Sequence, residues 1–377
     1  MSQSSLARSP RRVAIVGAGV IGLSIGWRLA QAGVAVTVYE KHQPGRGASW
    51  AAAGMLAAGI ETEATEEVLF ALGSWSQSLW PAFAGELEAA AGTEIGYDTT
   101  GTLACAFTRD QAARLRQAMA LQSRVGADLH WLDAAAARAL EPALGPGLVG
   151  AVLSPRDHQV DNRSLAAALV VALERAGGAL VAEAEIEVAP GRGIVRSGRL
   201  EPADLVVVAA GAWSGHLPGL PALARPPVRP IKGQMLAVRM EPAAPLIRHV
   251  VWGGTGYLIP RRDGRLLIGA TTEERGFDAS ITAGGLLGLL DDAWRTLPAI
   301  EDLPVDESWV GFRPGSPDDM PILGPTPVDG LVLATGHHRN GILLTPATAA
   351  LIAEYVLGGR VPPRMRPFGL DRFGAAP

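Results

Sequence analysis

Residues 13–22 read Val-Ala-Ile-Val-Gly-Ala-Gly-Val-Ile-Gly and decide the fold of the first part of the chain. The four apolar residues have the composition of a buried strand, and Gly17 after them can adopt the positive φ of a tight turn. Gly19 lets the backbone approach a pyrophosphate, and Gly22 lets the following helix pack closely on the strand. A second predicted strand ends at Glu40, where a ribose-binding carboxylate is expected. This order of elements predicts a Rossmann-like site for an adenine dinucleotide.

Composition and charge exclude several classes of protein. The chain of 377 residues carries 33 basic and 37 acidic residues, a net charge of −4, and has no basic run with interleaved aromatic residues. Nucleic-acid binding is therefore not expected. The single cysteine, Cys105, excludes an intrachain disulfide framework and a multi-cysteine metal site. A reducing, cytoplasmic location fits this cysteine usage.

The sequence also indicates no stable membrane insertion. Residues 1–10 are polar and serine-rich, so we expect a disordered tail there and no signal peptide. The longest uncharged stretch, Leu205–Ala224, approaches the ~20 residues of a membrane-spanning helix. It contains several glycines and prolines, which a lone helix in lipid would not carry together.

Apolar runs of two kinds predict two sheets. Val206–Gly211 and Leu331–Gly336 are nearly continuous apolar runs, typical of strands in a fully buried parallel sheet. Val228–Val238, Val250–Pro260 and Arg265–Ala270 show the alternation of an antiparallel sheet. Spacing of apolar residues at three and four predicts helices at Glu66–Ala91, Arg109–Ser123, Leu132–Leu140, Arg163–Ala176, Ile281–Leu297 and from about Gly341 to Leu357. The predicted class is α/β (α+β overall), with a Rossmann-like parallel sheet and an inserted, mainly antiparallel domain.

The interleaving of these runs favours FAD over NAD. A nicotinamide dehydrogenase with this glycine motif usually completes its cofactor site within one compact stretch of chain, whereas here the signals recur near both ends. We expect a discontinuous FAD-binding domain and an inserted substrate-binding domain. Their predicted pieces are 11–85, 147–220 and 308–377 for the first, and 86–146 and 221–307 for the second.

A further stretch, Ala48–Leu56, is here called the alanine segment. It reads Ala-Ser-Trp-Ala-Ala-Ala-Gly-Met-Leu and offers few polar atoms beyond its backbone. Three alanines before a glycine suit a main chain that approaches a flat ligand closely. An ordinary buried, alanine-rich helix is the alternative interpretation.

Several blocks in chain order resemble the D-amino-acid oxidase superfamily, and within it the bacterial glycine oxidases of thiamine biosynthesis. The resemblance runs from about Val13 to Gly358, and its most specific parts are the alanine segment and the block His-Arg-Asn-Gly-Ile-Leu-Leu. The blocks are the glycine motif, the alanine segment, Val206–Trp213, Trp309–Pro314 and Gly336–Leu344.

This resemblance implies non-covalent FAD and the oxidative deamination of glycine, sarcosine and small D-amino acids by hydride transfer to flavin. The implied products are the 2-oxo acid (glyoxylate from glycine), ammonia and hydrogen peroxide, with molecular oxygen as the second substrate. A place in thiamine thiazole synthesis and a homo-oligomeric state are further expectations. Cys105 lies in an early predicted strand, away from the later segment where related sarcosine oxidases attach flavin, so we expect a buried small residue.

Residues of the glycine motif, the alanine segment and the two later blocks are expected to contact FAD. They are Gly17, Gly19, Val20, Ile21, Gly22, Glu40, Lys41, Ser49, Ala52, Ala53, Gly54, Met55, Ala210, Gly211, Trp213, Arg313, His338, Arg339, Asn340, Gly341 and Ile342. Arg339 stands where a buried strand turns into a helix, so its charge would favour a reduced, anionic flavin. No metal site is expected at His337 and His338, because adjacent side chains diverge and no third ligand is evident.

The resemblance places three residues on the substrate: Tyr257, Arg313 and Arg339. Arg313 can bind a carboxylate through two parallel hydrogen bonds, although an ion pair with Asp318 or Asp319 is the alternative. Tyr257 can add a hydroxyl, although it can equally be an ordinary half-buried sheet residue. No acid or base is assigned, because a neutral amine can release a hydride directly.

Three other functions remain open from the sequence. They are a D-amino-acid dehydrogenase that passes electrons to a quinone, a nicotinamide-dependent dehydrogenase, and a non-catalytic flavoprotein subunit. The segments Gly253–Gly256 and Thr271–Thr272 are expected to shape the amine side of the pocket, which bears on the choice of substrate.

Overall fold

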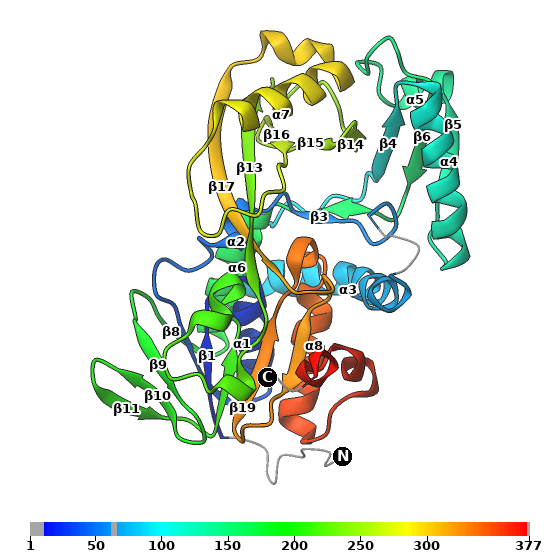
Figure 1. The fold of residues 1–377 in the computed structure, drawn as a ribbon. Coiled ribbons are helices and arrows are strands. Elements are labelled where there is room, and N and C mark those ends of the chain that lie inside the picture. Colours follow the sequence, from blue (N-terminus) through cyan, green and yellow to red (C-terminus); the bar gives the residue numbers. More distant parts are fainter. Residues whose placement is uncertain (1–10, 62–65, 375–377) are drawn as a thin grey trace.

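Two sheets organise the chain in the computed structural model, which describes residues 11–61 and 66–374 (Figure 1). One sheet has six strands in the order β18-β19-β12-β1-β2-β8, and the other has eight in the order β17-β13-β16-β15-β14-β4-β6-β5. The two sheets lie in different halves of the molecule, with the long strands β13 and β17 running between them. The tail predicted for residues 1–10 lies outside the described residues.

The six-stranded sheet contains the predicted dinucleotide-binding strands. β1 pairs in parallel with β2 and with β12, and β18 alone among the paired strands runs antiparallel to its neighbour. Its core strands are buried on both faces, which explains their continuous apolar runs. The strands are β1 (Arg12–Val16), β2 (Ala35–Tyr39), β8 (Ala179–Val181), β12 (Leu205–Val208), β18 (Ile322–Pro325) and β19 (Leu331–Thr335).

Alternate residues of this sheet contribute to two separate cores. Val13 and Ile15 pack with four helices on one face: α1 (Val20–Gln31), α3 (Glu67–Ala91), α6 (Asn162–Arg175) and α8 (Thr345–Gly358). Ala14 and Val16 pack on the other face with an antiparallel meander, β9 (Ile186–Ala189), β10 (Gly193–Arg196) and β11 (Arg199–Pro202). The sheet is therefore covered on both sides.

The eight-stranded sheet is antiparallel except where β14 meets β4. Its strands are β4 (Thr102–Ala106), β5 (His130–Asp133), β6 (Gly150–Ser154), β13 (Arg229–Arg239), β14 (Val250–Gly253), β15 (Gly256–Pro260), β16 (Arg265–Gly269) and β17 (Val305–Gly315). The helices α4 (Arg109–Arg124), α5 (Ala134–Leu140) and α7 (Ala283–Thr296) accompany it.

Short elements complete the chain. The alanine segment forms the helix α2 (Ala48–Ala51) and the strand β3 (Met55–Leu56), which pairs with β7 (His158–Gln159) between the two halves (Figure 1). The 3₁₀ helices are η1 (Gly211–His216), η2 (Ala222–Ala224), η3 (Pro298–Asp302), η4 (His338–Asn340), η5 (Pro363–Phe368) and η6 (Leu370–Phe373). Across residues 11–61 and 66–374, no helix is both long enough and apolar enough to span a membrane.

The predicted fold class is confirmed, and three local predictions differ from the structure. The stretch predicted as one strand at Val250–Pro260 is a hairpin, because Gly254 turns the chain with φ +62°. The helix predicted at Leu132–Leu140 starts two residues later, since Leu132 and Asp133 still belong to β5. The meander β9–β11 was not predicted, because its three strands are only four residues long.

The predicted domain pieces do not follow sheet membership at two places. β6 belongs to the eight-stranded sheet, although residues 147–220 were assigned to the FAD-binding domain. β17 also pairs along its length with β13, although residues 308–377 were assigned to the same domain. The division into two domains otherwise stays a prediction.

Candidate active site

The glycine motif forms a tight cradle at the end of β1. Gly17 has φ +108°, and a Cβ atom there would lie 2.4 Å from the carbonyl oxygen of Ala209. A Cβ atom on Gly22 would lie 1.9 Å from the carbonyl oxygen of Gly17. Side chains at these two positions would therefore break the approach of loop, helix and β12, as a dinucleotide-binding turn requires.

The N-terminus of α1 and the end of β2 meet beside this cradle. The N-cap residue of α1 is Gly19, which has no side chain to cap the helix, and the first turn of α1 carries no acidic residue. Such a terminus presents backbone N–H groups and the positive end of the helix dipole to an anion. The Glu40 carboxylate accepts hydrogen bonds from the N–H groups of Ala18 (2.9 Å) and His42 (3.0 Å). It is thereby fixed where the ribose is expected.

The alanine segment lies between this cradle and the eight-stranded sheet. The Val20 N–H group donates a hydrogen bond of 3.0 Å to the Ser49 hydroxyl. On the other side, the Trp309 indole donates one of 3.0 Å to the carbonyl of Ala51. A Cβ atom on Gly311 would lie 2.3 Å from that of Ala51. The segment is thus a short helix and an extended loop, and the alternative of an ordinary alanine-rich helix is wrong.

Three other predicted cofactor residues, Gly211, Trp213 and Lys41, differ in their surroundings. Gly211 begins η1, and its carbonyl accepts a hydrogen bond of 3.0 Å from the Thr335 hydroxyl. Trp213 in the same turn is 41% exposed and stacks on Phe277 at 5.0 Å between ring centres. Lys41 pairs with the exposed Glu185 at 2.9 Å. Contact of these residues, and of the other predicted cofactor residues, with FAD stays a prediction.

The block after β19 turns through η4 into α8. His337 and His338 are both neutral at ordinary pH, because burial lowers their pKa values to about 3 and about 4. The His337 ring contacts the Thr348 hydroxyl at 3.0 Å, and His338 lies 3.3 Å from Asp319. Among the residues that the structure describes, no group of three His, Cys, Asp or Glu side chains is placed to hold a metal ion.

Tyr257 and Arg313 lie close together on the eight-stranded sheet. Burial raises the pKa of Tyr257, and the charge of Arg313 opposes this rise. The Arg313 guanidinium donates a hydrogen bond of 3.1 Å to the carbonyl of Thr271. A Cβ atom on Gly233 would lie 2.6 Å from the same guanidinium, so a glycine makes room for it.

The neighbours of Arg313 and Tyr257 bear on the alternative roles of these two residues. Asp318 is paired with Arg372 at 2.7 Å, and among the described residues neither Asp318 nor Asp319 forms an ion pair with Arg313. Tyr257 packs edge-on against Trp252 at 5.1 Å in an apolar cluster that includes Ala51 and Ala53 of the alanine segment. Its partly buried side chain therefore lies at the junction with the alanine segment, and its contact with a substrate stays a prediction.

Arg339 lines a small surface recess with Asn340, Phe70 and two acidic residues, Glu61 and Glu66. Its guanidinium donates a hydrogen bond of 3.3 Å to the carbonyl of Glu61 and two of 3.1 Å to the carboxylate of Glu66. Arg339 is thus already paired with a carboxylate, so a substrate carboxylate would have to share this guanidinium with Glu66 or displace it.

Glu61 is a candidate that the sequence reasoning did not identify. Burial raises the pKa of its carboxyl to about 7, and the charge of Arg339 opposes this rise. The N–H groups of Gly59 and Ile60, which precede it, donate hydrogen bonds of 2.9 and 2.7 Å to the buried Asp157. The sequence signal was the acidic run after the alanine segment, which resembles a solvated loop. Titratable groups with shifted pKa values are typical of functional sites.

Comparison with known proteins identifies the family of this chain. The sequence profile of the FAD dependent oxidoreductases matches residues 12–355. The chain belongs to this family. FAD is thus its cofactor, and the glycine cradle, the open N-terminus of α1 and Glu40 fit the dinucleotide part of that group. The predicted resemblance to the D-amino-acid oxidase superfamily is confirmed, and so is the prediction of an FAD-dependent enzyme.

Two relatives show the extent of the similarity. Glycine oxidase of Geobacillus kaustophilus is 38% identical, and the match covers 96% of both chains. The bifunctional protein ThiO/ThiG of Trichormus variabilis is also 38% identical, over 96% of this chain and 55% of that protein. The chain therefore spans about half the length of the bifunctional relative.

Solved structures agree with this assignment. The crystal structure of the Geobacillus kaustophilus glycine oxidase has a TM-score of 0.88 at 37% identity, over 96% of this chain and 99% of that one. Iminodiacetate oxidase from Chelativorans sp. BNC1 has a TM-score of 0.87 at 30% identity, over 95% and 98% of the two chains.

Proposed function

We propose that this chain oxidises glycine and other small amines, including sarcosine and small D-amino acids, to the 2-oxo acid; hydrolysis of the oxidised amine releases ammonia, or methylamine in the case of sarcosine. Molecular oxygen is the proposed electron acceptor and hydrogen peroxide the second product. The observation that carries this proposal is that Tyr257 and Arg313 lie together beside the alanine segment, while Arg339 and Glu61 line a neighbouring recess. Two cations and a hydroxyl match a carboxylate, and a buried acid lies beside them.

Arg313 is the proposed anchor of the substrate carboxylate. Its planar guanidinium can donate two parallel hydrogen bonds, which fix both the distance and the tilt of a carboxylate. Tyr257 adds a hydroxyl donor from β15, and its partly buried ring is packed edge-on against Trp252. Together they would hold the α-carbon of a small amino acid in one place.

FAD, when bound, supplies the oxidising chemistry by accepting a hydride from the α-carbon. The chain's own part is to bind, orient and exclude water. Met235, Trp252 and Ala270 belong to the apolar cluster around Tyr257 and keep this side of the site dry. The Arg339 charge next to the recess would favour negative charge that develops on a neighbouring ring.

Names of the relatives support the choice of substrate. Several curated relatives carry the name glycine oxidase, and those from Geobacillus kaustophilus and Pseudomonas aeruginosa are 38% and 37% identical. The likeness to proteins named ThiO/ThiG supports a place in thiamine thiazole synthesis. Non-covalent binding of FAD, a homo-oligomeric state and a cytoplasmic location stay predictions.

Anaerobic mixing of the FAD-loaded protein with a panel of small amines tests the proposal. Glycine and sarcosine are expected to bleach the flavin absorbance within the turnover time, and air is expected to restore it with release of peroxide. Flavin that no amine bleaches would instead support a non-catalytic subunit. Flavin that is bleached by amines but recovers only with a quinone would support the dehydrogenase alternative.

A further inference from the structure

A buried guanidinium lies at the junction of the alanine segment and the eight-stranded sheet. It belongs to Arg261, which follows β15 and is 7% exposed. Its Nη2 atom donates hydrogen bonds to the carbonyl of Ala53 (2.7 Å) and to Asn162 Oδ1 (3.1 Å), and its Nη1 atom donates one of 2.7 Å to Gln159. All three acceptors are neutral.

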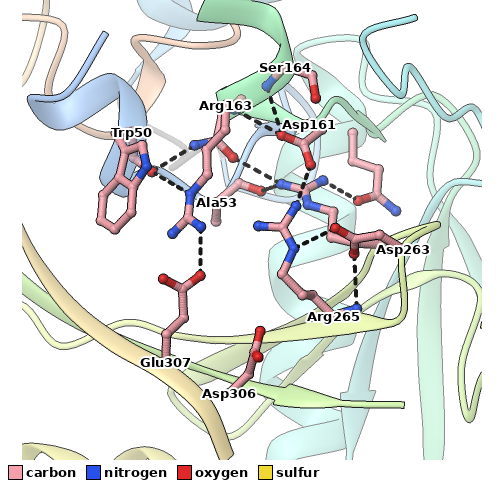
Figure 2. Close-up of polar contacts among 12 residues, drawn as sticks. Trp50, Ala53, Asp161, Arg163, Ser164, Asp263, Arg265, Asp306 and Glu307 are labelled. Carbon is pink, nitrogen blue, oxygen red and sulfur yellow. Dashed lines mark hydrogen bonds and ion pairs between the residues drawn. The ribbon is translucent and has the colours of Figure 1, made fainter. Parts of the chain in front are cut away.

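The neighbouring arginines at this junction behave differently. Arg163 reaches Glu307 at 2.6 Å, and Arg265 reaches both Asp161 at 2.8 Å and Asp263 at 2.7 Å (Figure 2). Buried arginines are usually paired with carboxylates in this way, because an unpaired buried charge is costly. Arg261 instead donates its hydrogen bonds to Ala53 of the alanine segment and to the neutral side chains of Gln159 and Asn162. Burial lowers the pKa of the Arg261 guanidinium to about 10.

Asn162 extends the same contact along the alanine segment. It is the first residue of α6 and is 2% exposed. While its oxygen accepts from Arg261, its amide nitrogen donates to the carbonyls of Ser49 (2.8 Å) and Trp50 (3.0 Å). Figure 2 shows Trp50 and Ala53 next to the polar contacts of this junction. The side chains of Arg261 and Asn162 therefore bind three residues of the alanine segment, namely Ser49, Trp50 and Ala53.

The loop held in this way also touches the dinucleotide cradle. The Ser49 hydroxyl accepts the hydrogen bond from the first residue of α1, Val20. A Cβ atom on Gly54 would lie 2.8 Å from the Arg261 guanidinium and 2.0 Å from the carbonyl of Val160, so the loop cannot move toward this network. Any displacement would go in the opposite direction, away from Arg261.

We propose that Arg261 and Asn162 are positioning residues that hold the alanine segment at the distance at which its backbone contacts FAD. This inference rests on the proposed placement of FAD against the alanine segment. Arg261 comes from the eight-stranded sheet and Asn162 from α6, so the cofactor surface is fixed by both halves of the molecule. The effect should appear in FAD affinity and in the spectrum of the bound flavin.

Titration of the FAD-free protein with FAD, without any amine, tests the proposal. Arg261→Gln is expected to weaken FAD binding about tenfold or more, because three hydrogen bonds from a charged donor are lost. The visible absorption band of the bound flavin is expected to change shape. Arg265→Gln is the matched control, since it removes a charge from the same junction but leaves the alanine segment untouched. It should stay within about threefold of the parent protein, with an unchanged spectrum.

Two further variants keep the test decisive if Arg261→Gln does not fold. Arg261→Lys keeps the charge but can reach fewer acceptors, and Asn162→Ala removes the contacts with Ser49 and Trp50. Each is expected to weaken FAD binding, and the two changes together should weaken it by less than the product of the single effects. Parent-like affinity and spectrum in both would overturn the proposal, as would an equal loss in Arg265→Gln. Because no amine is present, failure of the proposed oxidation would leave this result unchanged.

Discussion

The predicted cradle for the dinucleotide and the proposed pocket for the substrate are built from different parts of the chain. The cradle consists of backbone atoms and tight glycines within residues 17–22, completed by Glu40 a short distance along the sequence. The pocket consists of side chains, with Tyr257 from β15, Arg313 from β17 and Arg339 from η4. A backbone site is sensitive to added atoms, whereas a side-chain site is sensitive to removed charge. The two should therefore fail in separable ways.

The largest expected effect is on the cradle. Gly22→Ala places a methyl group where only 1.9 Å separates it from the carbonyl of Gly17, so the loop and α1 must move apart. We expect protein without bound FAD, measured by the absence of visible absorbance after purification. Gly284→Ala is the control, because a Cβ atom there meets no atom within 4 Å. Full FAD content in Gly22→Ala would show that the cradle is misassigned.

The second prediction concerns the pocket and leaves the cradle intact. Arg313→Lys removes the planar, two-pronged donor, and such a loss is worth roughly 2–4 kcal/mol. The apparent KM for glycine should rise by about 30-fold to 1000-fold, while the FAD content stays equal to that of the parent. Arg372→Lys serves as a control, since Arg372 pairs with Asp318. An unchanged KM in Arg313→Lys would remove this residue from the site.

The third prediction uses the buried carboxyl of the recess. The pKa of Glu61 is raised from 4.5 to about 7, so the folded state binds this proton more tightly than the unfolded state does. The protonated Glu61 therefore adds to the free energy of unfolding below pH 4.5. This contribution, about 3 kcal/mol at most, is lost as the pH rises toward 7. Glu61→Gln should lack this loss. Urea unfolding of the FAD-free protein at pH 5.5 and pH 8 measures it, and equal pH dependence in both proteins would contradict the assignment.

The smallest effect is expected from the tyrosine hydroxyl. Tyr257→Phe removes one hydrogen-bond donor and keeps the ring packed against Trp252, so the loss should be about 1 kcal/mol. The apparent KM should rise by several-fold to about tenfold, with kcat and FAD content little changed. A fall in FAD content would mean that Tyr257 supports the cofactor and not the substrate.

The sequence predicted the cradle well because its geometry depends on neighbours in the chain. The second strand, Ala35–Tyr39, ends directly before Glu40 as predicted, and the glycines lie where the motif requires. Glu61 was missed because its partner Arg339 is 278 residues away. Arg261 was missed for the same reason, since it contacts Ala53 across 208 residues. The local sequence of a charged residue in a polar loop predicts exposure to solvent, because the residues that bury it are distant in the chain.

One strand has a consequence for how this enzyme can diverge. Trp309, Gly311 and Arg313 alternate along β17 and share one face, on which the first two contact Ala51. A single inserted or deleted residue in β17 would turn this face away and present Val310 and Phe312 in its place. Changes of substrate among descendants of this sequence should thus arise by substitution on that face, while changes of length accumulate in the loops beyond the two ends of the strand.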